Sequence, residues 1–421
     1  MKSFFRVLFR LSLVALLALP CGFVFAREAP VVKRFSFGSA KTASGYVAVS
    51  PADLYTLERG YGFEPAAEGR APVFFSVTLP EGNYRVTVTL GGGGAASCTT
   101  IKAELRRLML EQVRTAPGET VTRSFVVNIR TPALATGGRV HLNVPRETVD
   151  EAVAWDEKLT LEFNGTSPAV NTVVIEAVDV PTVYILGDST VTDQGSEPYA
   201  SWGQMLPRFF RPDIAVANHA ESGESLGNST RVGRFAKVLG LMKPGDYLLI
   251  QYGHNDMKSK APDALARYRA TLKDWVEKTK QKGGLPILVT SVNRHTFRDG
   301  KVINSLRDYP DTVRAVAAEE SVPLIDLHLM SKQLYEALGE QGSAKAFKHD
   351  DSPRFDHTHH SPYGAYELAK CIVEGIRLNV PGLAAHMAPE VAPYDPAKPS
   401  DPEQFGLPPS PGFTSKRPLG D

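Results

Sequence analysis

Five short apolar runs alternate with helical stretches from residue 181 onward, and this alternation limits the possible folds more than any other feature. The runs read VYILG, IAVAN, YLLIQYG, PILVTSV and VPLIDLH. Strands that are apolar throughout belong to sheets buried on both faces, and the stretches between them supply the covering helices. Because parallel strands are joined by right-handed crossovers, residues 181–387 are predicted to form a three-layer α/β/α domain.

One of the intervening stretches shows helical periodicity along its whole length. It reads PDALARYRATLKDWVEKTKQ at residues 262–281. Its larger apolar side chains recur at helical spacing, and most of the side chains between them are charged. The apolar face comprises Leu265, Tyr268, Leu272, Trp275 and Val276. The pattern predicts an amphipathic helix that packs on the sheet.

The preceding region, residues 27–180, shows period-two alternation instead. In VFFSVTLPEGNYRVTVTL, two alternating runs at 74–79 and 84–90 flank a Pro-Glu-Gly-Asn turn, which predicts a hairpin. Further alternating runs read RSFVVNIRT, KLTLEFNG and NTVVIEAVDV. Regularly spaced short strands with turn residues between them predict a β-sandwich or jelly-roll domain.

The first 26 residues have the features of a secretory signal peptide: basic residues, a short apolar core, and a small-x-small site ending at Ala26. The apolar core is shorter than the roughly 20 residues of a membrane-spanning helix. Cys21 offers a lipoprotein alternative, which the proline before it disfavours. Cleavage would leave 44 basic and 46 acidic residues. We therefore expect a secreted or periplasmic, monomeric protein with no membrane or nucleic-acid partner.

Two cysteines remain after cleavage, Cys98 and Cys371. They lie far apart in the chain and form no CxxC pair, so free buried thiols are expected rather than a disulfide or a zinc site. Residues 388–421 are rich in proline and lack periodicity. This segment is predicted to be an extended tail, either packed on the domains or disordered.

Polar residues follow each predicted parallel strand, where ligands bind in open α/β sheets. The strand-end segments read GDST, NHAESGES, YGHND and SVNRHTF, and a later segment, RFDHTHHSPYGA, precedes a helix. Acyl transfer needs a nucleophile, a base, a group that orients the base, and oxyanion donors. Ser189 can be the nucleophile and His359 the base, with Asp356 holding the correct imidazole tautomer.

Three donors are predicted for the oxyanion: the backbone amides of Ser189 and Gly223 and the side-chain amide of Asn255. Gly223 suits this role because a residue without Cβ lets the backbone approach a ligand closely. Asn255 supplies a neutral, fixed dipole where negative charge develops.

Each motif also has a simpler interpretation. Gly-Asp-Ser can be a helix cap at a βα turn, and DHTHH can be a metal cluster. Gly223-x-Ser225-x-Gly227 resembles a nucleophile elbow, which would make Ser225 the nucleophile. In an elbow, however, the strand runs directly into the first glycine, whereas here a polar loop intervenes. The ordered set of polar strand ends favours Ser189.

The four segments together resemble the GDSL or SGNH hydrolase superfamily, with Ser189, Gly223, Asn255 and His359 as its namesake residues. GDSTVTDQ, GHNDMK, NSLRDYP and DHTHHSPYGA are most similar to its rhamnogalacturonan acetylesterase branch. The resemblance implies a flavodoxin-like α/β/α fold and a secreted enzyme without metal or other cofactor that deacetylates pectic polysaccharide. The stretch FSFGSA and SGYVAVSPADLYTLERGYGFE is similar to galactose-binding-like β-sandwich modules.

Two positions depart from that branch, whose members often carry Arg after the second-segment glycine and paired arginines in the fourth segment. This chain has Glu224 at the first position and Arg294-His295 at the second, and both positions are candidates for lining the substrate cleft. Arg294 and Arg231 are candidate contacts for an anionic sugar, although either can equally be a solvated surface charge.

The combined expectation is a secreted serine esterase whose partner is acetylated plant cell-wall polysaccharide. Acetylxylan esterase and lysophospholipase or lipase activity are the alternative hydrolase functions. A carbohydrate-binding protein with a silent hydrolase domain is the alternative from another class.

Overall fold

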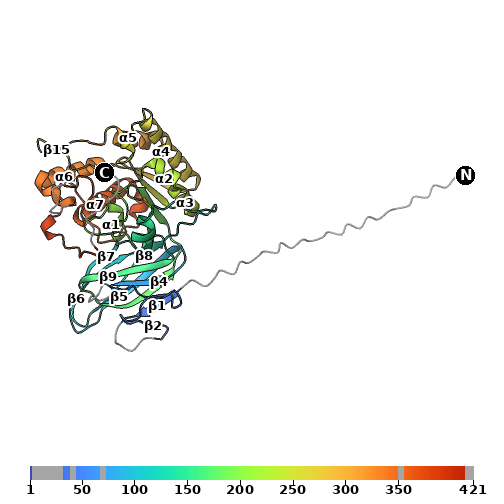
Figure 1. Ribbon diagram of the computed structural model, residues 1–421, viewed down its shortest axis with the longest axis vertical. Coiled ribbons are helices and arrows are strands. Elements are labelled where there is room, and N and C mark those ends of the chain that lie inside the picture. The colour runs from blue at the N-terminus through green and yellow to red at the C-terminus, as the bar shows by residue number, and fades with distance from the viewer. Residues whose placement is uncertain (2–31, 38–43, 67–72, 349–354, 413–421) are drawn as a thin grey trace. The chain divides into compact units, whose positions relative to one another are not determined.

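The computed structural model of the chain describes residues 1, 32–37, 44–66, 73–348 and 355–412 (Figure 1). The predicted signal peptide lies outside these ranges apart from its first residue. Residues 31–421 form one compact unit. Among the helices of the described ranges, none is both long and apolar enough to cross a membrane.

The second half of this unit is built on a five-stranded parallel sheet, which all five apolar runs enter. Its strands are β11 (Thr182–Gly187), β12 (Ala215–Asn218), β13 (Tyr247–Gln251), β14 (Leu285–Val289) and β17 (Leu324–Ile325). Their spatial order is β12-β11-β13-β14-β17, the flavodoxin-like order 2-1-3-4-5. The order reverses between β11 and β13, so the strand ends on either side of this point should carry the site.

Alternate residues of the sheet face two separate cores. On β11, Val183 and Ile185 pack into one core, while Tyr184 and Leu186 pack into the other. Helices that contribute to the first core are α1 (Trp202–Met205), α6 (Leu327–Ser343), α7 (Pro362–Asn379) and α8 (Pro381–Ala384). Those that contribute to the second are α2 (Leu226–Arg231), α3 (Arg234–Leu241), α4 (Ala264–Gln281) and α5 (Tyr309–Glu319). In Figure 1 these two helix groups flank the sheet on opposite sides, which confirms the predicted three layers.

The predicted amphipathic helix corresponds to α4. Tyr268, Leu272, Trp275 and Val276 are buried in the second core. The Trp275 indole stacks on the Phe235 ring of α3, with 4.1 Å between ring centroids. The apolar periodicity thus identified both the helix and its buried face.

The first half of the unit is a β-sandwich of two five-stranded sheets, in agreement with the predicted β-domain. One sheet has the order β2-β1-β10-β5-β8 and contains β1 (Val32–Ser36), β2 (Val47–Ala48), β5 (Gly82–Gly91), β8 (Thr120–Ile129) and β10 (Val170–Ala177). The other has the order β3-β4-β9-β6-β7 and contains β3 (Tyr61–Phe63), β4 (Phe74–Thr78), β6 (Ser97–Ala103), β7 (Arg107–Thr115) and β9 (Lys158–Ser167). Inward-facing side chains of both sheets form a single apolar core.

The predicted hairpin at 74–90 is wrong. β4 pairs with β3 and β9, whereas β5 pairs with β8 and β10 in the opposite sheet. Phe75 and Val77 of β4 meet Val86 and Val88 of β5 in the sandwich core. Alternation shows that one face of each strand is buried, but a short turn can join strands of facing sheets as well as neighbours in one sheet.

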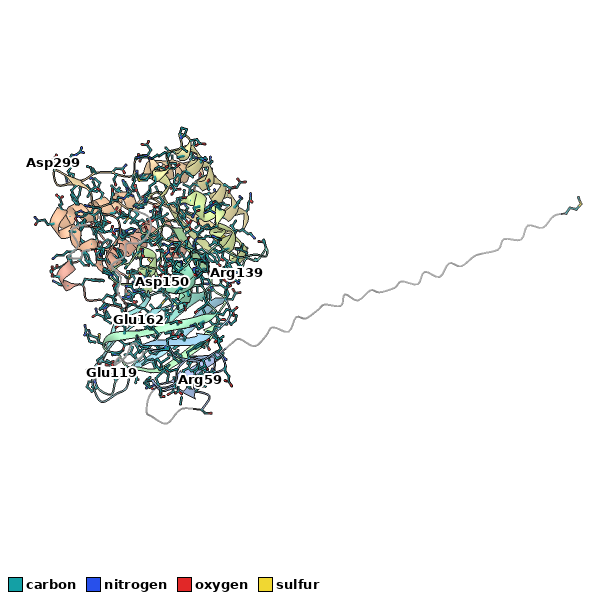
Figure 2. The ribbon with its side chains drawn as sticks, in the orientation of Figure 1. Arg59, Glu119, Arg139, Asp150, Glu162 and Asp299 are labelled. Carbon is teal, nitrogen blue, oxygen red and sulfur yellow. The ribbon has the colours of Figure 1, made fainter. Side chains whose placement is uncertain are left out.

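The tail packs on both halves of the unit. On β9, Glu162, labelled in Figure 2, accepts a hydrogen bond from Ser410 Oγ at 2.8 Å. Lys102 of the sandwich donates to Ser410 Oγ and the Pro408 carbonyl, and Phe405 packs against the first core of the parallel sheet. The packed alternative for the tail therefore holds for residues 388–412.

The remaining elements are short. Two strands, β15 (Phe297–Arg298) and β16 (Lys301–Val302), form a small antiparallel ribbon. The helical turns are η1 (Arg146–Asp150), η2 (Ala152–Ala154), η3 (Leu206–Phe209), η4 (Asp256–Lys258), η5 (Ala344–Ala346) and η6 (Pro402–Gln404). Cys98 and Cys371 are free and buried, as expected.

Candidate active site

Ser189 lies in the tight turn that follows β11. Asp188 closes the turn: its carbonyl accepts from the Val191 amide and its Oδ1 from the Thr190 amide and hydroxyl. A Cβ on Gly187 would lie 2.6 Å from the Val191 side chain, so only glycine fits where strand and turn meet. The turn thereby holds Ser189 in one place at the end of the strand.

The backbone carbonyl of Ser189 accepts two hydrogen bonds, whereas its backbone N–H makes none within the described residues. The carbonyl accepts from Gln194 Nε2 at 2.7 Å and from Ser201 Oγ at 2.8 Å. The amide N–H has no acceptor within the described part of the chain, although the residue is only 1% exposed. Buried N–H groups are rarely left unpaired, so this one is a donor available to a bound ligand.

His359 and Asp356 complete a hydrogen-bonded chain with Ser189. His359 Nε2 lies 2.9 Å from Ser189 Oγ, and His359 Nδ1 lies 3.0 Å from Asp356 Oδ2. All three side chains are buried. The ring of Tyr199 meets the imidazole edge-on, with 6.0 Å between centroids. This is the geometry of a nucleophile, a base and a group that orients the base.

The local charges keep Asp356 ionised. Its Oδ1 accepts from the amides of Thr358 and His359, both at 3.0 Å. Burial acts to raise the pKa of Asp356, but the hydrogen bond and charge of the His359 ring, with the two amides, bring that pKa well below its ordinary value. An ionised Asp356 stabilises a positive charge on His359.

Gly223 lies on the loop after β12, the strand next to β11 in the sheet. Two hydrogen bonds from this loop to β11 fix its path: His219 N to the Ile185 carbonyl at 2.8 Å and Glu221 N to the Gly187 carbonyl at 3.1 Å. Gly223 has φ +82°, a conformation that favours glycine. Its N–H, like that of Ser189, has no acceptor among the described residues.

Asn255 follows β13 and reaches the same loop. Its Nδ2 donates to the Glu224 carbonyl at 2.9 Å, directly beyond Gly223. An amide nitrogen carries two hydrogens, so one remains for a ligand. The structure therefore brings the amides of Ser189, Gly223 and Asn255 to the ends of three adjacent strands.

Ser225 has a different role from the one that the elbow-like motif suggests. It is the N-cap of α2, and its hydroxyl accepts from the Asn228 amide at 3.2 Å. Ser, Asp and Asn are common at this position because they satisfy an N–H of the first helical turn.

The histidines of DHTHH have separate partners. His357 Nδ1 lies 2.7 Å from the His295 carbonyl, and His360 Nε2 lies 2.9 Å from the Tyr335 hydroxyl, whereas His359 faces Ser189. In the described ranges no three His, Cys, Asp or Glu side chains gather as metal ligands would.

Of the two positions that depart from the branch, Glu224 does not line a cleft. It is 1% exposed, and its carboxylate faces Arg234 at 3.6 Å and Asn228 at 2.6 Å. His295 is also largely buried, with Nε2 3.0 Å from the Glu340 carbonyl. Glu224 and His295 therefore do not line a cleft, because both side chains turn toward partners inside the domain.

Arg294 and Arg231 have protein partners of their own. Arg294 Nε donates to Thr358 Oγ1 at 3.1 Å, one residue from His359. Arg231 Nε donates to Asn228 Oδ1 at 3.1 Å. Arg294 thus borders the candidate site through the loop of the base.

Several supporting residues were not assigned roles from the sequence. His254 Nδ1 lies 3.3 Å from Asp188 Oδ2, and Gln194 and Ser201 hold the Ser189 carbonyl. His254 follows a strand, so its position was a usable signal. Gln194 and Ser201 lie in an irregular segment with no motif to mark them.

Asp256, next to Asn255, is a buried carboxyl group that borders the candidate site. Its Oδ1 accepts from the Leu226 amide, while its Oδ2 is buried with no hydrogen-bond partner in the described ranges. Burial and the Asp188 charge raise the pKa of Asp256 to about 7, against the lowering effect of the Leu226 amide.

The profile of the GDSL-like Lipase/Acylhydrolase family matches residues 185–365. The rhamnogalacturonan acetylesterase RhgT of Bacillus subtilis (strain 168) is 38% identical over 205 residues, covering 46% of this chain and 88% of that protein. The uncharacterized esterase YxiM of the same strain is 28% identical over 376 residues, covering 83% of this chain and 91% of that protein. A crystal structure of YxiM has 26% identity and a TM-score of 0.47, covering 83% of this chain and 98% of that one.

The region matched by the family profile holds Ser189, Gly223, Asn255, Asp356 and His359 together. The match to RhgT extends over most of that enzyme. The chain therefore belongs to the GDSL-like lipase/acylhydrolase family and is a carboxylic ester hydrolase.

Proposed function

We propose that the protein is a secreted serine esterase that removes acetyl groups from pectic polysaccharide, with rhamnogalacturonan as its substrate. The observation that carries this proposal is the buried chain of hydrogen bonds from Ser189 through His359 to Asp356, with two unpaired backbone N–H groups beside it.

In the first half-reaction, Ser189 Oγ attacks the acetyl carbonyl while His359 Nε2 takes the hydroxyl proton. The carbonyl oxygen becomes an oxyanion, which the amides of Ser189, Gly223 and Asn255 stabilise. The intermediate then collapses, and His359 returns the proton to the departing sugar oxygen. An acetyl-Ser189 ester and a free sugar hydroxyl result.

In the second half-reaction, water takes the place of the sugar. His359 removes a proton from the water, whose oxygen attacks the acetyl carbon, and the same three donors bind the second oxyanion. Collapse breaks the bond to Ser189 Oγ, which regains its proton, and acetate leaves. Asp356 stabilises the imidazolium in both halves.

The choice of substrate rests on two observations. RhgT, which shares 38% identity with this chain, is named a rhamnogalacturonan acetylesterase. A hollow of about 390 Å³ adjoins Asn255, and most of the residues that line it are of polar type, including Ser225, Asn228, Arg231 and Arg267. Hydroxyl, amide and guanidinium groups suit a sugar chain with carboxylates better than a long acyl chain.

The test is acetate release from acetylated rhamnogalacturonan, acetylated xylan and a lysophospholipid, compared at equal ester concentration. We expect the pectic substrate to give the highest kcat/KM and Ser189→Ala to abolish release. Faster acetate release from xylan, or fatty-acid release from the lipid, would show that rhamnogalacturonan is not the preferred substrate. Inactivation by Ser225→Ala, with Ser189→Ala active, would overturn the mechanism itself.

Export is part of the proposal, and it can be tested separately. Expression of the full chain in a secreting host should give a mature protein outside the cytoplasm whose first residue is Arg27. An N-terminal sequence that retains residues 1–26 would contradict cleavage after Ala26.

A further inference from the structure

The peptide group between Ser222 and Gly223 has an unusual anchor. Arg146 Nη2 donates to the Ser222 carbonyl at 2.9 Å. In the described ranges, both cis peptides precede proline, so this peptide is trans and its C=O and N–H point in opposite directions. The arginine that holds the Ser222 carbonyl therefore also sets the direction of the Gly223 N–H.

The same guanidinium nitrogen secures the other side of Ser222. Arg146 Nη2 lies 2.6 Å from Glu221 Oε1, and that oxygen also accepts from the Ser222 amide at 2.8 Å. Glu221 is 4% exposed, so the ion pair forms in a site that water screens little. On the far side of Gly223, Asn255 holds the Glu224 carbonyl. The loop is thus held from outside on both sides of Gly223, at the Ser222 carbonyl and at the Glu224 carbonyl.

An anchor matters here because of the glycine. Gly223 changes its φ at little cost, so the peptide before it can rotate unless its carbonyl is held. A rotated peptide would point the N–H to the side that the Ser222 carbonyl now occupies and put the carbonyl in its place. A hydrogen bond from a cation to the Ser222 carbonyl also polarises the peptide, which strengthens its N–H as a donor.

Arg146 comes from the sandwich half of the unit. It begins η1, in the connection between β8 and β9, and lies 76 residues before Ser222. Asp150, the last residue of η1, is labelled in Figure 2. Glu147 of η1 accepts from Arg234 of α3 at 2.6 Å and from the Trp155 indole at 3.0 Å. These buried contacts fix η1 against the α/β domain.

We propose that Arg146 is a positioning residue of the oxyanion hole, through which the N-terminal β-domain takes part in ester hydrolysis. The inference rests on the proposed function, because it needs Gly223 to donate to the oxyanion. It gives the β-domain a catalytic task that does not depend on whether this domain binds sugar.

The experiment compares Arg146→Ala, Arg146→Lys and Arg85→Ala in the full chain, with an aryl acetate as substrate. Arg85 is the matched control because it also reaches from the sandwich to a backbone carbonyl of the other half, that of Pro212, at 3.1 Å. Pro212 precedes β12, at the opposite end of this strand from Gly223. The measured quantities are kcat, KM, the unfolding midpoint, and inhibition by an alkylboronic acid that bonds to Ser189 as a tetrahedral adduct.

We expect Arg146→Ala to lower kcat about 10- to 100-fold with little change in KM, because the displaced donor acts only in the transition state. Boronic acid affinity should fall by a similar factor, Arg146→Lys should recover part of both losses, and Arg85→Ala should match the wild type. Equal kcat for the two alanine variants, or a lower kcat with unchanged boronic acid affinity, would overturn the inference.

Two further outcomes separate the inference from the proposals on which it rests. If Arg146→Ala does not fold, Arg146→Lys decides, and a folded lysine variant with full kcat and full boronic acid affinity would overturn the role of the guanidinium. The aryl acetate does not depend on the polysaccharide, so a wrong pectic substrate leaves the Arg146 test intact. A wild-type protein inert toward aryl acetate would overturn the acyl-enzyme mechanism and the inference together.

Discussion

Replacement of Asn255 by alanine tests the candidate oxyanion hole most directly. The side-chain amide is the one predicted donor that mutation can remove without altering the backbone. Its Nδ2 already donates one hydrogen to the Glu224 carbonyl at 2.9 Å, which leaves the other for the oxyanion. Asn255→Ala therefore removes a donor to the oxyanion and also one anchor of the Gly223 loop.

The size of the effect follows from the number of donors. Loss of one of the three donors costs about 100- to 1,000-fold in kcat, or about 3–4 kcal/mol of transition-state stabilisation. The lost anchor at Glu224 places Asn255→Ala toward the upper end of this range. Asn255→Asp should be worse than alanine, because a carboxylate has no hydrogen to donate and repels the oxyanion.

The assay is steady-state hydrolysis of an aryl acetate, with kcat and KM determined separately. KM should stay within about threefold of wild type, because the oxyanion exists only in the transition state and intermediates. Asn228→Ala is the matched control, since Asn228 donates to the Glu224 carboxylate at 2.6 Å. If Asn255→Ala retained kcat within about fivefold of Asn228→Ala, Asn255 would not be an oxyanion donor.

Three other variants test the site. Ser225→Ala should keep its activity and lose about 0.5–2 kcal/mol of stability with the helix cap, as chemical denaturation can measure; an inactive variant would restore the elbow interpretation. Asp356→Asn should lower kcat about 1,000- to 10,000-fold by misdirecting the His359 tautomer, and near-wild-type kcat would refute its role. Burial raises the pKa of Asp256 from 3.8 to about 7, so between these pH values the folded protein keeps a proton that the unfolded chain loses. The unfolding free energy of the wild type should therefore fall as pH rises from about 4 to about 7. Asp256→Asn should flatten that decline in unfolding free energy, whereas the exposed-site variant Asp274→Asn should leave it unchanged.

The parallel sheet could be predicted from the sequence because burial on both faces demands apolar residues at every position. VYILG illustrates this, since Val183 and Tyr184 face different cores. The hairpin prediction failed because alternation reports only which face of a strand is buried. One face of β4 and one face of β5 are buried in the same core. The alternation would look the same if the two strands paired within one sheet, so the sequence contains no signal that distinguishes pairing from packing across the sandwich.

The sequence could also predict that Ser189, Gly223 and Asn255 lie at the same edge of the sheet, since each follows a strand of one parallel sheet. Parallel topology brings the carboxyl ends of neighbouring strands to one edge, whatever the loops between them do. The directions of the loop side chains could not be predicted in this way. Glu224 and His295 follow strands too, yet both turn inward, because a buried partner rather than the strand sets their orientation.

Arg146 shows where sequence reasoning ends for this site. The segment HAESGES places Glu221 and Glu224 on either side of Gly223, and both carboxylates are buried. A buried carboxyl group that stays ionised requires a cationic partner, so the two glutamates favour an arginine or lysine close to the oxyanion loop. Arg234 of α3 lies near enough in the sequence to be a candidate, and it does face Glu224 and, at 4.0 Å, Glu221. Its hydrogen bond goes to Glu147, however, whereas the Ser222 carbonyl accepts from Arg146. The second cation comes from a connection in the β-sandwich, and only the docking of the two halves brings it there. The sequence therefore favours a cation at this loop, while the fold decides that Arg146 supplies it.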